Sequence, residues 1–290
     1  MRRVFITIII LVLLAVALFL KSRERVHDPI IRNRPLMDWL ALLSDDVAFK
    51  PDLQSERAEA EETIRSMGTN ALPFLLHHIA DDPSKSYFPQ RLGLGGRTPR
   101  RQAVAEGAIQ AMLCLGPIAN PAVPSLTELA HSTKNPDITI RALQALGCIR
   151  TTNTLPTLSA YLTNTNPRLV AAAIISLSGL QDAAHPAVAV IIAHLKDKND
   201  EVAGAAAYAL RRFQQDSAVV VPALINAVDD ARYEVRSLAV SSLAVFGGAA
   251  RPAVPTLLRC AQSTNEPFRI RATNALLRIA PEVLTNVPTQ

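Results

Sequence analysis

The side chains that most often carry out catalysis or bind metals are sparse in this sequence and form no known pattern. Two of the six histidines, His77 and His78, are adjacent, so on a helix they point about 100° apart and converge poorly on one metal ion. No His-Glu-x-x-His, Cys-x-x-Cys, Gly-x-Ser-x-Gly or EF-hand spacing occurs. We therefore predict no metal site, no cofactor and no catalytic residue.

The cysteines and carboxylates support the same prediction. A nucleophilic thiol needs an electropositive, exposed setting, whereas Cys114 and Cys148 stand in apolar sequence and Cys260 leaves the total odd. Paired acids such as Asp81-Asp82 fall at turns, where carboxylates stabilise the positive ends of helices. Helix capping is therefore favoured over acid–base catalysis.

One column of side chains, repeated at a fixed interval, suits recognition of another polypeptide. Amides can pair with a peptide backbone, a tyrosine can pack against it, and arginines attract acidic groups. The column consists of Gln110, Gln144, Ile175, Tyr208, Ser241 and Asn274, and the neighbouring arginines are Arg141, Arg211, Arg236 and Arg271. These residues are our candidates for partner binding.

This column recurs because the sequence repeats a pair of helices about every 33 residues. Within each unit the first helix begins near a Pro-x-Leu or its equivalent, at Pro73, Pro124, Pro156, Ala189, Pro222 and Pro255. Proline is tolerated in a first helical turn because its missing N–H has no intrahelical partner there. Asparagines before the second helix, at 135, 166, 199 and 265, predict N-caps.

The second helix of each unit carries one apolar face. Alanine recurs in every unit, at Ala108, Ala142, Ala173, Ala206, Ala239 and Ala272. A larger apolar residue follows four positions later, at Met112, Leu146, Leu177, Leu210, Leu243 and Leu276. This spacing forms one helical face, and the alanine column predicts close contact between helix backbones.

The helix pairs, the Pro-x-Leu and the V-x-x-x-A-x-x-A-L pattern resemble HEAT repeats, particularly the short bacterial, phycobilisome-lyase HEAT-like type. The resemblance covers residues 70–279, with residues 35–68 as a diverged cap that includes Trp39. It implies an all-α fold, a right-handed α-solenoid of about seven HEAT-like hairpins at 35–280, followed by a tail at 281–290. It also implies that the second helices line a concave groove; the alternative is that their polar column only packs against neighbouring repeats. No lyase activity is carried over, because the cysteines lack the required setting.

The N-terminus predicts a membrane anchor. An uncharged run at residues 4–20 lies between Arg2-Arg3 and Lys21, and its 17 residues are the short end of what spans a bilayer. We predict that residues 1–25 form a single-pass signal anchor and transmembrane helix, that 26–34 form a linker, and that the solenoid is extracytoplasmic. Cleavage after Ala17, giving a secreted or periplasmic protein, is the alternative.

A long insertion interrupts the repeat spacing. Pro73 and Pro124 are 51 residues apart, 18 more than one repeat, and the excess falls at 81–99. Tyr87 and Phe88 give this insertion an aromatic tip, so it is either a partner-gripping loop or a mobile surface loop. Its glycines lack the Gly-Lys-Ser/Thr of a phosphate loop.

Composition narrows the class of function. The 290 residues carry a formal charge of +5, 49% apolar and 4% aromatic residues, which suits packed helices better than β-structure. We predict a non-enzymatic, membrane-anchored scaffold that binds a protein or extended peptide, with no small-molecule substrate. The alternatives are a nucleic-acid-binding solenoid, which would need a Lys/Arg stripe that this column lacks, and a non-catalytic subunit of an enzyme complex.

Overall fold

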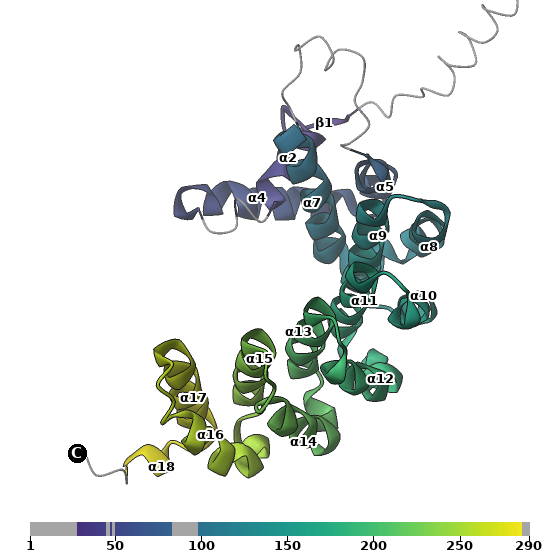
Figure 1. Ribbon diagram of the computed structural model, residues 1–290. Helices are drawn as coiled ribbons and strands as arrows, with labels where there is room; N and C mark the ends of the chain where they lie inside the picture. Colours follow the sequence, from purple (N-terminus) through teal and green to yellow (C-terminus); the bar gives the residue numbers. More distant parts are fainter. Residues whose placement is uncertain (1–27, 45–46, 48–49, 83–97, 286–290) are drawn as a thin grey trace, which may run out of the picture.

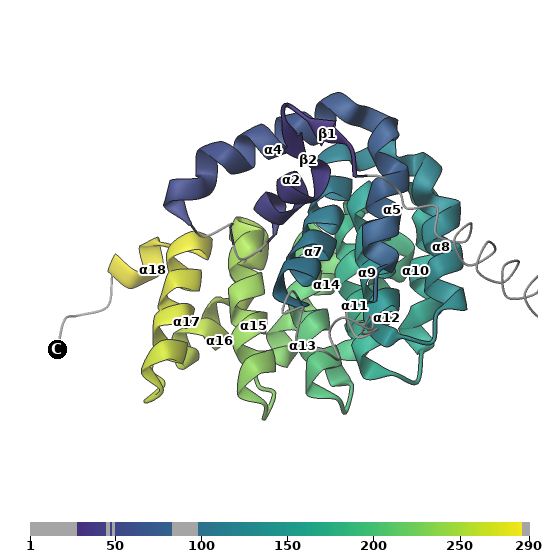
Figure 2. The ribbon, with the colours of Figure 1, turned by 90° about the horizontal axis from the view of Figure 1, so that it is seen from above.

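The computed structural model describes residues 28–44, 47, 50–82 and 98–285. Helix pairs follow one another along a curved path, and one helix of each pair lies on the inside of the curve (Figure 1). The inner helices stand side by side along the array (Figure 2), and each contacts the next. In this part of the chain the predicted all-α solenoid is confirmed.

Six pairs follow the N-terminal cap in the described residues. The outer helices are α5 (Leu72–Ala80), α8 (Val123–Ser132), α10 (Leu155–Ala160), α12 (Val188–Ala193), α14 (Ser217–Ala227) and α16 (Val254–Cys260). The inner helices are α7 (Thr98–Leu115), α9 (Pro136–Ile149), α11 (Pro167–Gly179), α13 (Asp200–Ala209), α15 (Tyr233–Leu243) and α17 (Glu266–Ile279). A short helix, α18 (Glu282–Thr285), follows α17.

Asparagine begins four of the inner helices, as predicted. The side-chain oxygens of Asn135, Asn166, Asn199 and Asn265 accept hydrogen bonds from backbone N–H groups in the first turn. An N-cap of this kind contributes about 1 kcal/mol relative to alanine. In α15 the N-cap residue is Arg232, whose own N–H donates to Asp230 Oδ1 at 2.8 Å.

The aligned apolar columns form the core of the array. All six predicted alanines, Ala108, Ala142, Ala173, Ala206, Ala239 and Ala272, are fully buried, as are the six larger residues four positions later. The helices are therefore held by burial of one shared face, and each repeat covers its neighbour.

The N-terminal cap contains more ordered chain than the sequence indicated. Residues 28–34, which we expected to be a linker, include a short hairpin of β1 (Ile30–Ile31) and β2 (Arg34–Pro35). The hairpin is fixed because the indole Nε1 of Trp39 donates to the Ile31 carbonyl at 3.0 Å. Trp39 is buried in α2 (Leu36–Leu43), so its indole belongs to the core of the cap.

Helix α2 lies against α7, and α4 (Gln54–Met67) lies against both. The contact between α2 and α7 is very close, since a Cβ on Gly107 would lie 1.7 Å from the Leu40 carbonyl oxygen. Only glycine fits there, so this residue sets the distance at which the cap docks.

One predicted helix start needs correction. Helix α14 begins at Ser217, five residues before Pro222, which therefore lies inside the helix. Its ring removes one backbone hydrogen bond, and the helix continues because Val220, Val221 and Leu224 are buried in the core. The other recurrent prolines stand in the first turn of their helices.

The predicted membrane segment at 4–20 and the aromatic tip Tyr87-Phe88 lie outside the described residues and stay predictions. Within the described part, the run Tyr233–Cys260 is long and apolar enough to cross a membrane. It is folded as α15, the 3₁₀ segment Ala244–Ala253 and α16, with Gly247 at φ 52° between them. Leu243 and Leu257 from this run are fully buried in the core, so its apolar character is explained by packing.

Candidate functional site

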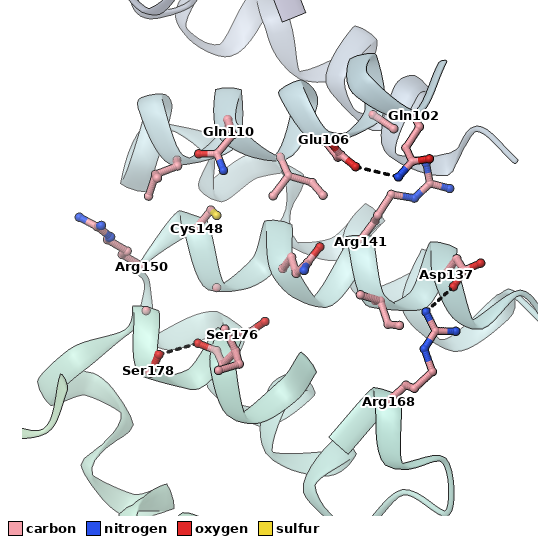
Figure 3. Close-up of a pocket in the computed structure, with 18 of the residues that line it drawn as sticks. Gln102, Glu106, Gln110, Asp137, Arg141, Cys148, Arg150, Arg168, Ser176 and Ser178 are labelled. Carbon is pink, nitrogen blue, oxygen red and sulfur yellow. Dashed lines mark hydrogen bonds and ion pairs between the residues drawn. The ribbon is translucent and has the colours of Figure 1, made fainter. Parts of the chain in front are cut away.

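A groove of about 890 Å³ lies along the inner helices α7, α9, α11 and α13 (Figure 3). Five of the predicted partner-binding residues line it: Gln110, Arg141, Gln144, Ile175 and Tyr208. Four successive inner helices contribute to the groove, so it follows the direction of the array.

The other predicted residues that the structure describes do not line this groove. Arg211 stacks on the Tyr208 ring, with the guanidinium carbon 4.4 Å from the ring centroid. Ser241 accepts a hydrogen bond from Arg271 at 3.4 Å, and both Arg271 and Asn274 are exposed on α17. Arg236 lies 5.4 Å from the Tyr233 ring centroid and 5.5 Å from that of Phe268. Arg211 therefore lies beside the groove, whereas Arg236, Ser241, Arg271 and Asn274 lie on α15 and α17, toward the C-terminal end.

The middle of the groove is apolar, and the two helices beneath it are closely packed. Ile109, Ile140 and Ile175 line it, and α9 and α11 approach closely because a Cβ on Gly147 would lie 2.7 Å from the Ser176 carbonyl oxygen. The hydroxyls of Ser176 and Ser178 donate to carbonyls of their own helix, each at 2.7 Å. They are therefore occupied within α11.

Arg141 is the most constrained charge in the groove. Its Nη2 donates to the Asp81 carbonyl oxygen at 2.5 Å, while its buried Nε has no hydrogen-bond partner among the described residues. Burial lowers the pKa of this guanidinium from its usual value, although the nearby Asp81 and Asp137 carboxylates oppose the shift. The unpaired N–H at Nε is a cost of burying this charge.

Ion pairs lie at the rim of the groove, near the ends of the helices. Arg168 Nη2 donates to Asp137 Oδ1 at 2.8 Å, joining α11 to α9. Arg101 Nε donates to Asp81 Oδ2 at 2.8 Å, which fixes the residue that Arg141 contacts. Arg101 and Asp81 are 20 residues apart along the chain, and this ion pair brings them together beside the groove.

One cysteine lines the groove, and its surroundings determine the reactivity of its thiol. Burial raises the pKa of Cys148, which lines the groove, to about 11, so its thiol stays protonated at neutral pH. Within the described ranges, no group of three or more histidines, cysteines and carboxylates is placed to hold a metal ion. The arrangement suits binding by shape, amide groups and charge.

Sequence reasoning missed part of the groove wall. Gln102, Asp137 and Arg168 line it together with Arg150 and Arg212. Arg150 stands at φ 57°, directly after α9. The predicted helix ends could have identified these residues. Side chains at the ends of α9 and α11 reach the rim of the groove, as do those on the concave face of the helices.

The repeats match a known family. Residues 101–178 and 123–211 match the family model of HEAT repeats, in two overlapping matches. The resemblance predicted from the Pro-x-Leu and alanine columns is thereby confirmed for this stretch. No curated protein sequence matches the chain.

Solved structures share the architecture at low identity. The karyopherin Kap121p bound to the extreme C-terminus of the protein phosphatase Cdc14p covers 84% of this chain at 13% identity, with a TM-score of 0.57. The same karyopherin bound to Pho4p gives 0.56 at 13% identity. This chain spans 29% of the karyopherin's length. The CpcE–CpcF complex of phycocyanin lyase from Nostoc sp. is similar over 92% of each chain, at 19% identity and a TM-score of 0.44.

Proposed function

We propose that this HEAT-repeat solenoid is a non-enzymatic, membrane-anchored scaffold whose concave groove binds an extended peptide or a helix of another protein. The observation that carries the proposal is the convergence of Gln110, Gln144, Ile175 and Tyr208 on one groove. Solenoids use such concave surfaces for extended binding, and karyopherin structures with a bound phosphatase C-terminus share this fold.

Each group in the groove has a distinct task in this proposal. The exposed amide of Gln144 and the amide of Gln110 exchange hydrogen bonds with the backbone of the bound segment. Tyr208, held by Arg211, and Ile175 supply apolar contact. Arg141, which also lines the groove, attracts an acidic group of the partner through the positive charge of its guanidinium.

A photo-crosslinking amino acid tests the groove in the full chain within native membranes. Placed at Gln144, it is expected to capture a discrete polypeptide. Placed at Val219, which is 55% exposed on the outer helix α14, it is the matched control. Replacing Tyr208 by alanine should reduce the yield from position 144 severalfold. The same species captured from both positions, or a yield unaffected by Tyr208→Ala, contradicts the proposal.

The same experiment separates the alternative functions. A crosslinked nucleic acid whose capture falls as salt is raised would favour the nucleic-acid-binding solenoid. A captured catalytic polypeptide would identify the protein as a non-catalytic subunit of an enzyme complex.

Membrane attachment and an extracytoplasmic solenoid are further parts of the proposal, supported by the uncharged run at 4–20. Deleting residues 1–25 should move the protein from the membrane pellet to the soluble fraction. Retention in the pellet would contradict the anchor. If the solenoid is extracytoplasmic, protease should degrade it in cells whose outer membrane is permeabilised and whose inner membrane is intact.

A further inference from the structure

The two edges of the groove differ in charge. Three carboxylate residues line it: Glu106 and Asp137 lie in the first halves of α7 and α9, and Asp82 lies near the start of α7. Arg150 and Arg212 lie at the opposite edge, where α9 and the 3₁₀ turn after α13 end. Figure 3 shows Arg150 at one end of α9 and Asp137 at the other. We call Arg150 and Arg212 the arginine edge.

The carboxylates near the starts of the helices already have polar or charged neighbours. Asp137 Oδ1 accepts a hydrogen bond from Arg168 at 2.8 Å. Glu106 Oε1 accepts one from the side-chain amide of Gln102 at 3.0 Å. The Arg101 guanidinium contacts the carbonyl oxygen of Asp82 at 3.5 Å, which places its positive charge close to that residue. A charged ligand would have to compete with these contacts, so this edge contributes little preference for charge.

The arginine edge carries charge without such neighbours. Both residues are exposed, and neither forms an ion pair with a carboxylate in the described part of the chain. The helix dipole favours a positive charge at the end of a helix, so no carboxylate is needed to stabilise them there. Arg211, stacked on Tyr208, adds a third positive charge beside them. The unpaired charge of the groove is therefore positive and lies along one edge.

This arrangement of charge favours a peptide over a nucleic acid. A nucleic-acid strand carries a negative charge on every nucleotide, so it would also place charge against Glu106 and Asp137. The groove between the two edges is apolar, with Ile109, Ile140 and Ile175. Successive side chains of an extended peptide point to opposite sides. Such a peptide can therefore direct carboxylates to the arginine edge and keep the rest of its length uncharged.

We propose that the groove binds an extended acidic peptide whose glutamate or aspartate side chains pair with Arg150 and Arg212. The inference rests on the proposed function, since it names the chemistry of the partner for the same groove. Arg150 follows α9 and Arg212 follows α13, with α11 between these helices, so two steps of about 8–10 Å separate the arginines. Because an extended chain rises about 3.3 Å per residue, carboxylates about six residues apart on the same side can reach both.

Two fluorescent peptides of about ten residues test this proposal on the full chain in detergent, with anisotropy as the measurement. One carries two glutamates about six residues apart among uncharged residues, and the other has lysines in place of the glutamates. The glutamate peptide should bind about tenfold more tightly than the lysine peptide. The difference should shrink as salt is raised, because the arginine edge is exposed.

Variants of the arginine edge show whether these two residues set the preference. Arg150→Glu/Arg212→Glu should prefer the lysine peptide, whereas Arg150→Lys/Arg212→Lys should still prefer the glutamate peptide because it retains the charge. The control is Lys198→Glu/Arg278→Glu, which makes the same change in net charge at exposed positions that do not line the groove. It should leave the preference as it is in the unmodified chain.

Binding of neither peptide, equal binding of both, or an unchanged preference in Arg150→Glu/Arg212→Glu overturns the proposal. A single-stranded oligonucleotide that binds more tightly than the glutamate peptide would overturn it in favour of nucleic acid. Photo-crosslinking from position Gln144 in native membranes separates this inference from the proposed function. Arg150→Glu/Arg212→Glu should capture less of the polypeptide than the unmodified chain does. Undiminished capture would overturn the acidic partner and leave the peptide-binding groove standing.

Discussion

Individual residues after the inner helices adopt left-handed backbone angles that only glycine adopts without strain. The position eight residues after the aligned alanine is Gly116 in one repeat and Gly247 in another, both at φ 52°. Arg150 and Gln181 occupy the same position at φ 57° and φ 52°. The positive φ is shared and the residue type is not, although ψ differs, at −130° for Gly247 and 38° for Arg150. The two larger residues, Arg150 and Gln181, therefore carry local strain.

Replacing Gln181 by glycine should stabilise the protein by about 0.5–1 kcal/mol, because glycine adopts this conformation without the Cβ clash. Gln181 is exposed and outside the groove, so binding should be unaffected. Urea denaturation is the measurement, and Gln181→Ala is the control that should show no gain. A loss of stability in the glycine variant would contradict the strain argument.

The carboxylates Asp230 and Asp197 make stability depend on pH. The Arg232 guanidinium, through its hydrogen bonds, lowers the pKa of Asp230 below its ordinary value. The backbone N–H of Asn199 does the same for the pKa of Asp197. Because the folded state holds these groups ionised more firmly than the unfolded chain does, their stabilisation is present above the ordinary carboxyl pKa of about 3.9 and is lost as pH falls through the lower folded-state pKa.

We therefore expect the free energy of unfolding to drop between pH 5 and pH 3, and to drop less in Asp230→Asn. Urea denaturation at the two pH values measures this difference. If the free energy of unfolding falls equally in the unmodified protein and in Asp230→Asn, other carboxylates are responsible for the loss of stability in acid.

At the scale of helices, glycine and alanine determine how closely neighbours approach. A Cβ at Gly107 would overlap the Leu40 carbonyl oxygen at 1.7 Å, so Gly107→Ala must push α2 away from α7. The expected cost is about 1–3 kcal/mol, with faster hydrogen exchange in α2. Gly248→Ala is the control, since its added Cβ meets no atom within 4 Å. Equal stability of the two variants would show that the cap adjusts freely.

The alanine column gives a second prediction at this scale. Ala206 is fully buried between neighbouring helices, so Ala206→Leu should destabilise by about 1–3 kcal/mol through overpacking. Ala193→Leu, at an exposed position, should have little effect. Thermal denaturation compares them, and an unchanged melting temperature for Ala206→Leu would contradict the helix register.

At the scale of the whole molecule, stability should vary along the array. Inner helices in the middle, such as α11, are covered by an inner helix on each side, whereas α17 is covered by α15 on one side. Native-state hydrogen exchange should therefore be slowest in α9, α11 and α13 and faster in α17. Uniform protection along the chain would indicate a single cooperative unit.

The sequence by itself determined the helices, most of their starts and the buried columns, the start of α14 at Ser217 being the exception. An Asn cap and an apolar face with helical spacing act within one or two turns, so Asn135 and Ala142 could be assigned without knowing what lay beside them. The polar column that supplies Gln110, Gln144 and Tyr208 was found for the same reason, because the repeat places equivalent residues on equivalent faces.

Only the tertiary structure decided which of those residues share one groove. Arg141 contacts Asp81, 60 residues earlier, and the curvature of the array separates Asn274 and Arg271 from the groove that Tyr208 lines. The position of each residue relative to the groove depends on how far each repeat is shifted and rotated from the one before it, and this shift accumulates over several helices. Close contacts such as Gly147 against Ser176 fix the shift between two repeats. No local pattern in the sequence encodes the accumulated shift.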